Sequence, residues 1–353
     1  MVAALVLAVA PLDGAFAKGD AKQARPAAQK VVKAKKKPAV KKQAVAPKRS
    51  AKRQVAKKRP AARKQVVAKR KQSTSRARAV ARRAAPVMAP LQLVDGKPLL
   101  KSTVAYVIDQ ETGEVLLGKN DDAVRPIASL TKLMTGIVIA EAGLPMNERI
   151  VITSDDVDRL KFSSSRLKVG TELTRRQALH LALMSSENRA AHALARTYPG
   201  GESAFVSAMN NMAQKLGMDQ TRYVEPTGLS SENQSSARDL AILTAAAYDR
   251  PLLRQYSTSP GYQLGSLRYV NTNRLVRAGD WRIGVQKTGY ISEAGQCLLM
   301  QAGVAGRKLI MVFLDATSPV ARIRDAETVK RWIATLPDDA GRPQAAATAS
   351  PQG

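Results

Sequence analysis

Apolar residues repeat along this chain with two different periods, and the two periods mark two kinds of structure. In residues 103–109 and 114–119 apolar positions alternate or run together on either side of Gln110-Glu111-Thr112-Gly113, which predicts a β-hairpin. Three later apolar segments are separated by turn residues and lie at 281–287, 296–304 and 308–314. Two early and three late strands predict one antiparallel five-stranded sheet.

Between the early and the late strands the apolar residues follow the helical period. Helices are expected at residues 126–143, 174–184, 189–197, 205–216 and 240–248, and an amphipathic helix at 320–336. Thr174 with Gln177 has the spacing of a capping box, and Ser236 with Asp239 marks a second helix start. The middle of the chain is therefore predicted to be helical throughout. The expected fold class is α/β (α+β): an antiparallel five-stranded sheet flanked by helices, plus a helical lobe.

Residues 2–10 form a short apolar run before Ala15-Phe16-Ala17, a small-x-small sequence typical of signal-peptide cleavage sites. We predict a signal peptide over residues 1–17 and export to the periplasm. The run has about half the length that a membrane span needs. Only Met1 precedes it, without a basic residue, so either the natural start lies upstream or the run is a buried strand.

Positive charge is concentrated in the segment that follows. The chain has a net charge of +29, and residues 18–83 hold 26 Lys and Arg against one acid, Asp20. Residues 18–92 are rich in Ala, Lys, Arg and Pro and contain no aromatic residue, so we predict that they are disordered. Residues 337–353 are predicted to be a second disordered tail.

A basic tail suggests a polyanion as partner. Nucleic acid is one candidate. In an exported protein the available polyanions are instead anionic cell-wall and membrane surfaces, so we do not expect nucleic acid. A solvated tether is an equal alternative.

Cysteine and histidine give no sign of a metal or cofactor. Cys297 is the one cysteine, which excludes an internal disulfide. His180 and His192 have no further ligand at metal-site spacing, so each is expected to be a surface or packing histidine on a helix.

Ser129 and Lys132 stand three residues apart at a predicted helix start, which places both side chains on one face. Pro126 is the expected start of that helix, so Ser129 falls in the first turn, where free N–H groups favour an oxyanion. Lysine can take the serine proton if desolvation or a second cation lowers its pKa. Apolar neighbours from Ile127 to Met134 could supply the desolvation. The alternative is an exposed helix start with a solvated lysine.

Two further motifs follow in order. Ser186-Glu187-Asn188 falls where a predicted helix breaks, and Lys287-Thr288-Gly289-Tyr290 lies on a predicted late strand. A glycine there would let a substrate backbone lie against the strand while its carboxylate meets Lys287 and Thr288. Each motif alone is common, but the three in this order form the set of class A β-lactamases and penicillin-binding proteins.

On these motifs, residues 104–336 resemble the low-molecular-mass penicillin-binding proteins of the D-alanyl-D-alanine carboxypeptidase and endopeptidase family. These are serine peptidases of the penicillin-binding protein and β-lactamase superfamily. The stretch from Lys287 to Tyr290, with Glu293-Ala294-Gly295 and Cys297-Leu298, is most similar to the periplasmic endopeptidase branch. Residues 93–336 are therefore expected to form a serine D,D-peptidase domain with a DD-peptidase/β-lactamase-like fold.

The resemblance implies a catalytic role for four residues. Ser129 would be the acylated nucleophile, with Lys132 as its base. Ser186 would relay a proton to the leaving amine. Asn188 would hold Lys132 and the substrate amide.

The resemblance also implies how substrate is bound. Lys287 and Thr288, beside Gly289, would take the substrate carboxylate, and the N–H groups of Ser129 and Tyr290 would form the oxyanion hole. The partners would be peptidoglycan peptides, with β-lactam antibiotics as covalent inhibitors. No cofactor is implied.

One segment resembles a β-lactamase element imperfectly. Glu225-Pro226-Thr227-Gly228-Leu229 is similar to the Glu-Pro-x-Leu-Asn loop in which Glu activates water, but Leu229 comes one residue late and Ser230 replaces the Asn. We expect a structural role for this turn, as in the peptidases.

The leading hypothesis is a periplasmic serine D,D-peptidase that hydrolyses D-alanyl bonds of peptidoglycan. The short segment after residue 336 favours the soluble cross-link endopeptidase over the carboxypeptidase. The alternatives are a D,D-carboxypeptidase of the same family, a β-lactamase, and a polyanion-binding protein driven by the basic tail.

Overall fold

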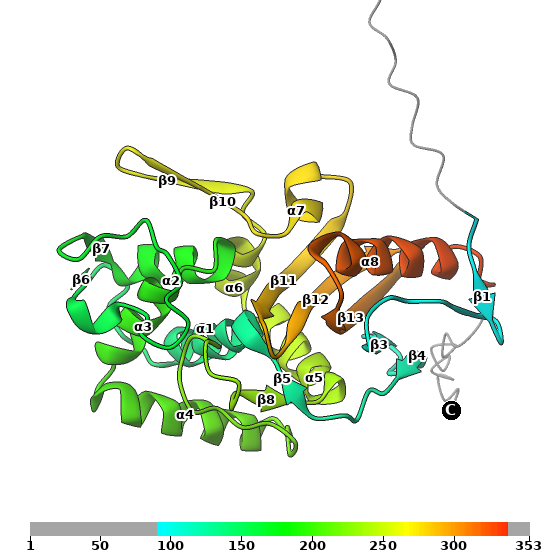
Figure 1. The fold of residues 1–353 in the computed structure, drawn as a ribbon, viewed down its shortest axis with the longest axis horizontal. Coiled ribbons are helices and arrows are strands. Elements are labelled where there is room, and N and C mark those ends of the chain that lie inside the picture. Colours follow the sequence, from blue (N-terminus) through cyan, green and yellow to red (C-terminus); the bar gives the residue numbers. More distant parts are fainter. Residues whose placement is uncertain (1–89, 338–353) are drawn as a thin grey trace, which may run out of the picture. The chain divides into compact units, whose positions relative to one another are not determined.

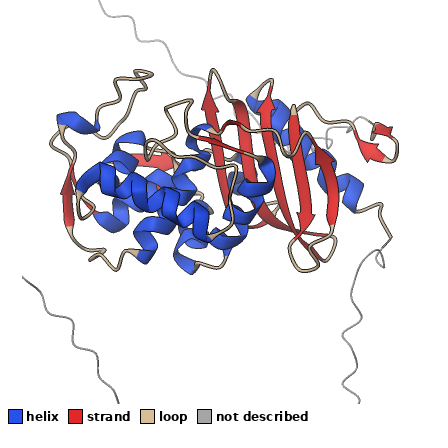
Figure 2. Ribbon diagram, turned by 90° about the horizontal axis from the view of Figure 1, so that it is seen from below, coloured by secondary structure: helices blue, strands red, loops and turns tan. Residues whose placement is uncertain are grey.

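The computed structural model describes residues 90–337 of the chain. The predicted signal peptide, the predicted basic segment up to residue 89 and the predicted tail from residue 338 lie outside the described residues. Within residues 90–337 a sheet stands on one side and most of the helices gather on the other (Figure 1, Figure 2).

Five antiparallel strands form the central sheet, in the order β11–β12–β13–β3–β4. They are β3 (Val104–Asp109), β4 (Val115–Lys119), β11 (Arg282–Ile291), β12 (Gly295–Val304) and β13 (Arg307–Ala316). The sheet and the hairpin of β3 and β4 confirm the predicted fold class. Strand β11 lies at an edge, so one side of its backbone faces the helical lobe instead of another strand.

The sheet is covered on both faces, which explains the nearly continuous apolar runs in β12 and β13. Successive residues of β13 enter opposite cores: Met311 and Phe313 pack with one apolar cluster, and Ile310 and Val312 pack with the other. Helix α8 (Pro319–Ile333) covers the first face, and helix α5 (Ala237–Tyr248) covers the second.

The helical lobe is built from the middle of the chain. Its helices are α1 (Thr131–Glu141), α2 (Arg175–Met184), α3 (Asn188–Arg196), α4 (Gly201–Lys215) and α6 (Pro251–Ser257), with the short α7 (Arg274–Ala278) near the sheet. Thr174 and Gln177 form the predicted capping box at the start of α2. Ser236 accepts a hydrogen bond from the Asp239 N–H at the start of α5, as predicted.

The predicted start of the first helix is wrong. Pro126 belongs to a two-residue strand, β5 (Arg125–Pro126), which pairs with β8 (Gln234–Ser235). A 3-10 turn, η1 (Ala128–Leu130), then leads into α1, so Ser129 lies in that turn and not in the first turn of the α-helix. Proline tolerates this position because an edge pairing of two residues needs few N–H donors.

The prediction of a middle region that is helical throughout is also wrong. Besides β5 and β8, three further two-stranded sheets were not predicted, two of them in the middle of the chain, and η2 (Ser154–Asp156) follows the first strand of one of these. They are β1 (Leu93–Val94) with β2 (Lys97–Pro98), β6 (Arg149–Val151) with β7 (Glu172–Thr174), and β9 (Gly261–Leu264) with β10 (Leu267–Val270). The β9–β10 hairpin packs beside helix α2, where the Tyr262 ring lies 4.5 Å from the His180 ring. Strands of two to four residues are too short to show a period.

No helix within residues 90–337 combines the length and the apolar character that crossing a membrane would require.

Candidate active site

A cavity of about 520 Å³ lies along the edge strand β11, where the strand meets the helical lobe. Six of the eight predicted site residues line it, and the buried Lys132 and Lys287 form hydrogen bonds to four of these six. The lining consists of Ser129, Lys161, Ser163, Ser186, Asn188, Leu229, Thr272, Thr288, Gly289, Tyr290, Ile291, Ser292 and Arg322. The three sequence motifs therefore meet at one cavity.

The Lys132 amine lies under Ser129. Its Nζ donates hydrogen bonds to Ser129 Oγ (2.8 Å), to Asn188 Oδ1 (2.6 Å) and to the carbonyl oxygen of Thr227 (2.6 Å). The side chain is fully buried. Burial lowers the pKa of Lys132 to about 8, and the carboxylates of Glu225, Glu187 and Asp158 oppose that change. A neutral amine is therefore accessible near neutral pH, as removing the Ser129 proton would require.

The backbone around Ser129 is tightly constrained. Ala128 adopts a left-handed φ of 48°, which is uncommon for alanine. Gly228 and Gly289 approach this turn closely: a Cβ on Gly289 would lie 3.1 Å from Ser129 N, and one on Gly228 would lie 1.9 Å from Ala128 O. Two glycines therefore let the turn lie against both its neighbouring loop and strand β11.

A second lysine–serine pair faces the first. Lys287 Nζ donates to Ser186 Oγ (2.8 Å) and to the carbonyl oxygen of Thr288 (2.7 Å). Burial lowers the pKa of Lys287 well below its ordinary value, and the charges of Lys132 and Arg322 add to this effect. Ser186 has a left-handed φ of 61° in the break between α2 and α3, which turns its hydroxyl toward Lys287.

Asn188 joins Lys132 to the loop that borders the cavity. Its Oδ1 accepts from Lys132, and its Nδ2 donates to Ser163 Oγ at 2.8 Å. Because one amide group contacts both sides, a shift of helix α3 would move the base and the loop together.

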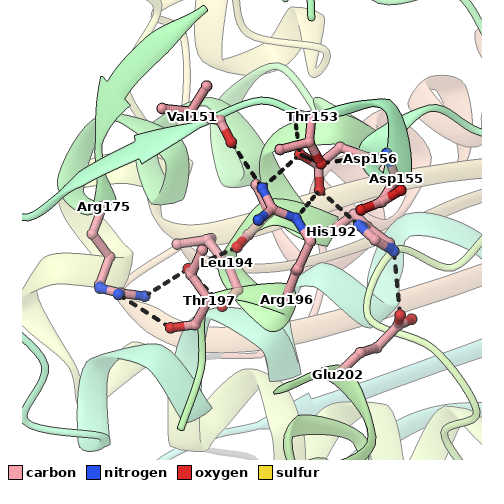
Figure 3. A network of polar contacts seen from close by, with 11 residues as sticks. Val151, Thr153, Asp155, Asp156, Arg175, His192, Leu194, Arg196, Thr197 and Glu202 are labelled. Atoms are coloured by element: carbon pink, nitrogen blue, oxygen red, sulfur yellow. Dashed lines mark hydrogen bonds and ion pairs between the residues drawn. The ribbon is translucent and has the colours of Figure 1, made fainter. Parts of the chain in front are cut away.

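A buried carboxylate holds helix α3, which begins at Asn188 (Figure 3). Asp156 accepts hydrogen bonds from His192 Nδ1 (2.8 Å), Arg196 Nε (3.0 Å), Arg196 Nη2 (2.9 Å) and the Thr153 N–H (2.7 Å). Burial alone would raise the pKa of Asp156, but the hydrogen bonds from His192, Arg196 and Thr153 lower it to about 2. The carboxylate therefore stays charged and fixes α3 to the loop after β6.

Both ring nitrogens of His192 face carboxylates. Nδ1 contacts Asp156, and Nε2 lies 3.3 Å from Glu202 Oε2 at the start of α4. Only the protonated ring can donate to both. Burial alone would lower the pKa of His192, but the hydrogen bond to Asp156 and the charges of Glu202 and Asp156 raise it.

Seven of the residues that line the cavity were not predicted as site residues, and two of them, Arg322 and Thr272, contact the third motif. Arg322 of α8 donates through Nη1 to the carbonyl oxygens of Gly289 (2.8 Å) and Cys297 (2.9 Å). The Thr272 hydroxyl lies 2.7 Å from the Thr288 hydroxyl. The signal for Arg322 was present, since it lies on the buried face of the amphipathic helix with Ala326 and Val329. Thr272 has no such signal.

The comparisons with known proteins agree with this arrangement. The profile of a family described as D-alanyl-D-alanine carboxypeptidase matches residues 92–318. A D-alanyl-D-alanine endopeptidase of Pseudomonas aeruginosa is 46% identical over 252 residues, which cover 68% of this chain and 80% of that protein.

Solved structures show the same fold. The DD-transpeptidase of Streptomyces K15 superposes with a TM-score of 0.63 at 28% identity, covering 68% of this chain and 99% of that one. Penicillin-binding protein D2 of Listeria monocytogenes, in its ampicillin-bound form, gives a TM-score of 0.59 at 29% identity, covering 67% and 98%.

Proposed function

We propose, from the premise that this chain belongs to the D-alanyl-D-alanine carboxypeptidase family of serine hydrolases, that it cleaves D-alanyl peptide bonds of peptidoglycan through an acyl-enzyme on Ser129. The observation that carries the proposal is the buried Lys132 amine, 2.8 Å from the Ser129 hydroxyl at the floor of a cavity beside an edge strand. This pair supplies a nucleophile and its base.

Acylation follows from this contact. The neutral Lys132 amine takes the Ser129 proton while Oγ bonds to the carbonyl carbon of the D-alanyl residue. The C–N bond then breaks as the leaving nitrogen takes the proton of the Ser186 hydroxyl, which Lys287 contacts at 2.8 Å. The proton that Lys132 took from Ser129 returns to Ser186, so both groups end acylation neutral. In deacylation Lys132 takes a proton from the water whose oxygen bonds to the ester carbon, and it gives that proton to Ser129 Oγ as the ester C–O bond breaks.

The oxyanion of each tetrahedral intermediate is assigned to the N–H groups of Ser129 and Tyr290. Both border the cavity, and the close approach of Gly289 to Ser129 N brings the strand and the turn together. Fixed backbone donors at this position stabilise developing negative charge without reorganisation.

The substrate carboxylate is assigned to Thr288 and Arg322. Lys287, expected to meet this carboxylate directly, is buried beneath the cavity and bonded to Ser186 and to Thr288 O. Thr288 and Arg322 both line the cavity and combine a hydroxyl with a guanidinium.

Glu225 has a structural role in this proposal. Its carboxylate accepts from the N–H groups of Thr227 and Gly228, both at 2.6 Å, and from Asn233 Nδ2 at 2.9 Å. These bonds close the turn whose Thr227 carbonyl oxygen holds Lys132. A carboxylate used in this way is not available as a base for water, which favours a peptidase over a β-lactamase.

The name of one relative supports endopeptidase activity. The Pseudomonas aeruginosa protein named D-alanyl-D-alanine endopeptidase shares nearly half of the aligned residues. With the predicted signal peptide over residues 1–17, we infer that the mature protein is a periplasmic endopeptidase and that β-lactams acylate it. The basic segment is assigned to anionic cell-wall or membrane surfaces.

The test is labelling with a fluorescent penicillin followed by mass spectrometry of the adduct. We expect the label on the peptide that contains Ser129, no label in Ser129→Ala, and full label in Ser207→Ala, which removes an exposed serine of α4. A label on any other residue would overturn the assignment of the nucleophile. Release of D-alanine from a pentapeptide without cleavage of a cross-linked dimer would make the protein a carboxypeptidase.

A further inference from the structure

A second cavity, of about 640 Å³, lies where β11 begins, β12 ends and β13 begins. It shares no lining residue with the active-site cavity, and Gly284 of this cavity lies four positions before Thr288, which is about 13 Å of strand. We call it the distal cavity. Its lining consists of Tyr248, Asp280, Arg282, Ile283, Gly284, Gln301, Gly303, Ala305, Gly306, Arg307, Lys308 and Lys330.

Positive charge dominates the distal cavity. Four of the twelve lining residues are Lys or Arg, and one, Asp280, is an acid. Arg307 and Lys308 pair with acids of the β3–β4 hairpin. Arg282 and Lys330 form no ion pair with an acid within residues 90–337. These two cations are therefore available to an anionic ligand.

Both available cations are held in place by contacts that leave their charge uncompensated. Lys330 Nζ donates to the carbonyl oxygen of Asp280 at 3.1 Å and lies 4.5 Å from the centre of the Trp281 ring. The aliphatic part of Arg282 lies over Gly303, because a Cβ added to this glycine would be 3.7 Å from Arg282 Cβ. A carbonyl group and an aromatic face orient a cation without neutralising it.

A buried amide also faces the distal cavity. Gln301 of β12 is 3% exposed and lines the cavity, and its side chain forms no hydrogen bond to another residue that the structure describes. Buried amides are normally hydrogen-bonded. An amide at a cavity wall takes its partner from whatever occupies the cavity, so Gln301 indicates a polar occupant.

Gly284 makes room for this amide and for an aromatic ring. A Cβ on Gly284 would lie 2.2 Å from Gln301 Oε1 and 2.4 Å from a carbon of the Tyr248 ring. Tyr248, at the end of α5, is held by Arg254, whose Nη1 donates to the Tyr248 carbonyl oxygen at 2.6 Å. An amide and a phenol therefore lie side by side over glycine backbone, and both can form hydrogen bonds to hydroxyl groups.

We propose that the distal cavity binds a sugar that carries an oxyanion, either a carboxylate or a phosphate. Arg282 and Lys330 bind the oxyanion through charge-assisted hydrogen bonds. Gln301 and Tyr248 bind hydroxyl groups of the sugar. A cavity of this size lies within the range of sites for small ligands. The inference does not depend on the proposed function, because none of these residues lines the active site.

Titrations of the full-length protein with glucose-6-phosphate, glucuronate, glucose and inorganic phosphate test the site. The chain has two tryptophans, so the indole N–H signals in NMR spectra report separately on Trp281, beside Lys330, and on Trp332, which donates to the Gly96 carbonyl oxygen. Trp281→Phe assigns the two signals. Anions that bind to the basic segment leave the Trp281 signal in place.

We expect the two charged sugars to move the Trp281 signal. Glucose and inorganic phosphate should bind roughly tenfold more weakly or worse, because each lacks one of the two sets of contacts. The tighter of glucose-6-phosphate and glucuronate identifies the oxyanion, and binding of either supports the site.

Three variants separate the contacts. Arg282→Gln and Lys330→Gln should each weaken binding of the charged sugars roughly tenfold. Gln301→Leu should remove the advantage of glucose-6-phosphate over inorganic phosphate and leave the affinity for inorganic phosphate unchanged. Arg149→Gln breaks an exposed ion pair away from the cavity and should bind as the wild type does.

Two outcomes would overturn the proposal. An unmoved Trp281 signal with both charged sugars, or unchanged affinity in both Arg282→Gln and Lys330→Gln, would exclude the oxyanion site. Equal affinity of the wild type for glucose-6-phosphate and inorganic phosphate would exclude the sugar. Arg282 and Lys330 are not buried, so their variants keep the test valid even where Gln301→Leu does not fold. Penicillin labelling is a separate readout, so either proposal can fail while the other stands.

Discussion

At the scale of single residues, the proton on Lys132 controls the chemistry. Its folded pKa of about 8 means that the amine is mostly charged at pH 7, and a charged amine cannot take the Ser129 proton. We therefore predict that acylation by penicillin speeds up about tenfold per pH unit below pH 8 and levels off above it. Stopped-flow acylation rates between pH 5.5 and 9.5 measure this. A rate that falls as pH rises from 6 to 8 would contradict the role of Lys132 as base.

A single substitution of Glu225 distinguishes a structural role of its carboxylate from a role as the base in deacylation. Its carboxylate raises the pKa of Lys132, so Glu225→Gln should shift the acylation profile to lower pH. The variant should also lose about 1 to 3 kcal/mol of stability, because a glutamine amide repeats only part of the bonding in the turn. The lifetime of the penicilloyl adduct, followed by mass spectrometry, should be nearly unchanged. A much longer lifetime would identify Glu225 as the deacylating base.

The site residues that were predicted from the sequence belong to the three motifs, whereas Arg322 and Thr272, which were missed, belong to none of them. Ser129 and Lys132 are close in the chain, so their contact follows from helical geometry. The Lys287–Ser186 bond spans 101 positions, and no local pattern shows that Lys287 would lie beneath the cavity. For Arg322 the amphipathic pattern of α8 indicated a buried position, but the part of the sheet that it contacts depends on how α8 packs.

At the scale of elements, the loop after Pro226 sets the position of the nucleophile turn. Gly228 has a φ of 81°, and a Cβ there would lie 1.9 Å from Ala128 O and 2.8 Å from Ser129 N. Gly228→Ala should therefore displace the turn and reduce penicillin acylation by at least about 100-fold, since misplaced catalytic groups cost this much.

Gly170→Ala is the matched control for this substitution. Gly170 has a similar φ of 87°, but nothing lies within 4 Å of an added Cβ. It should cost about 1 to 2 kcal/mol of backbone strain and leave acylation intact. Thermal unfolding and acylation rates of both variants separate strain from displacement. Equal acylation rates in the two variants would show that the turn adapts to an added methyl group.

The anchor of α3 should depend on pH. The pKa of His192 is raised in the folded protein, so its contribution to stability is fully present below its unfolded value of about 6.5 and is lost as pH rises through the folded value. His192→Gln should therefore destabilise the protein more at pH 5.5 than at pH 8.5. Urea unfolding of both proteins at the two pH values measures the difference. An equal loss at both would mean that the ring acts by packing alone.

The elements that were predicted correctly are long enough to show a repeating pattern of apolar residues, or they begin with a helix-capping sequence. Strands β11, β12 and β13 were recognised from apolar runs, and α2 from its capping box. The β9–β10 hairpin and the β5–β8 pairing were missed, because each depends on contacts between segments that carry no repeating pattern of their own. The same long-range pairing explains why Pro126 does not begin the helix.

At the scale of the whole molecule, the strongly basic segment and the residues assigned to the active site lie in different parts of the sequence. Residues 18–83 carry 26 of the 57 Lys and Arg, whereas all the residues assigned to the site lie between 129 and 322. The family match also begins after this segment, at residue 92. Binding to a charged surface and cleavage of a peptide bond can therefore be tested independently.

Deleting residues 18–86 should leave hydrolysis of a small soluble D-alanyl-D-alanine peptide unchanged, because the segment contains none of the motif residues. The same deletion should reduce retention on cell-wall sacculi at low salt, since many exposed Lys and Arg attract an anionic polymer. Added salt should reduce retention of the full-length protein in the same way, because attraction between exposed charges is screened beyond about 8 to 10 Å at physiological ionic strength. Equal retention of both forms at every salt concentration would make the segment a passive tether, and loss of small-peptide hydrolysis would show that it acts on the catalytic residues.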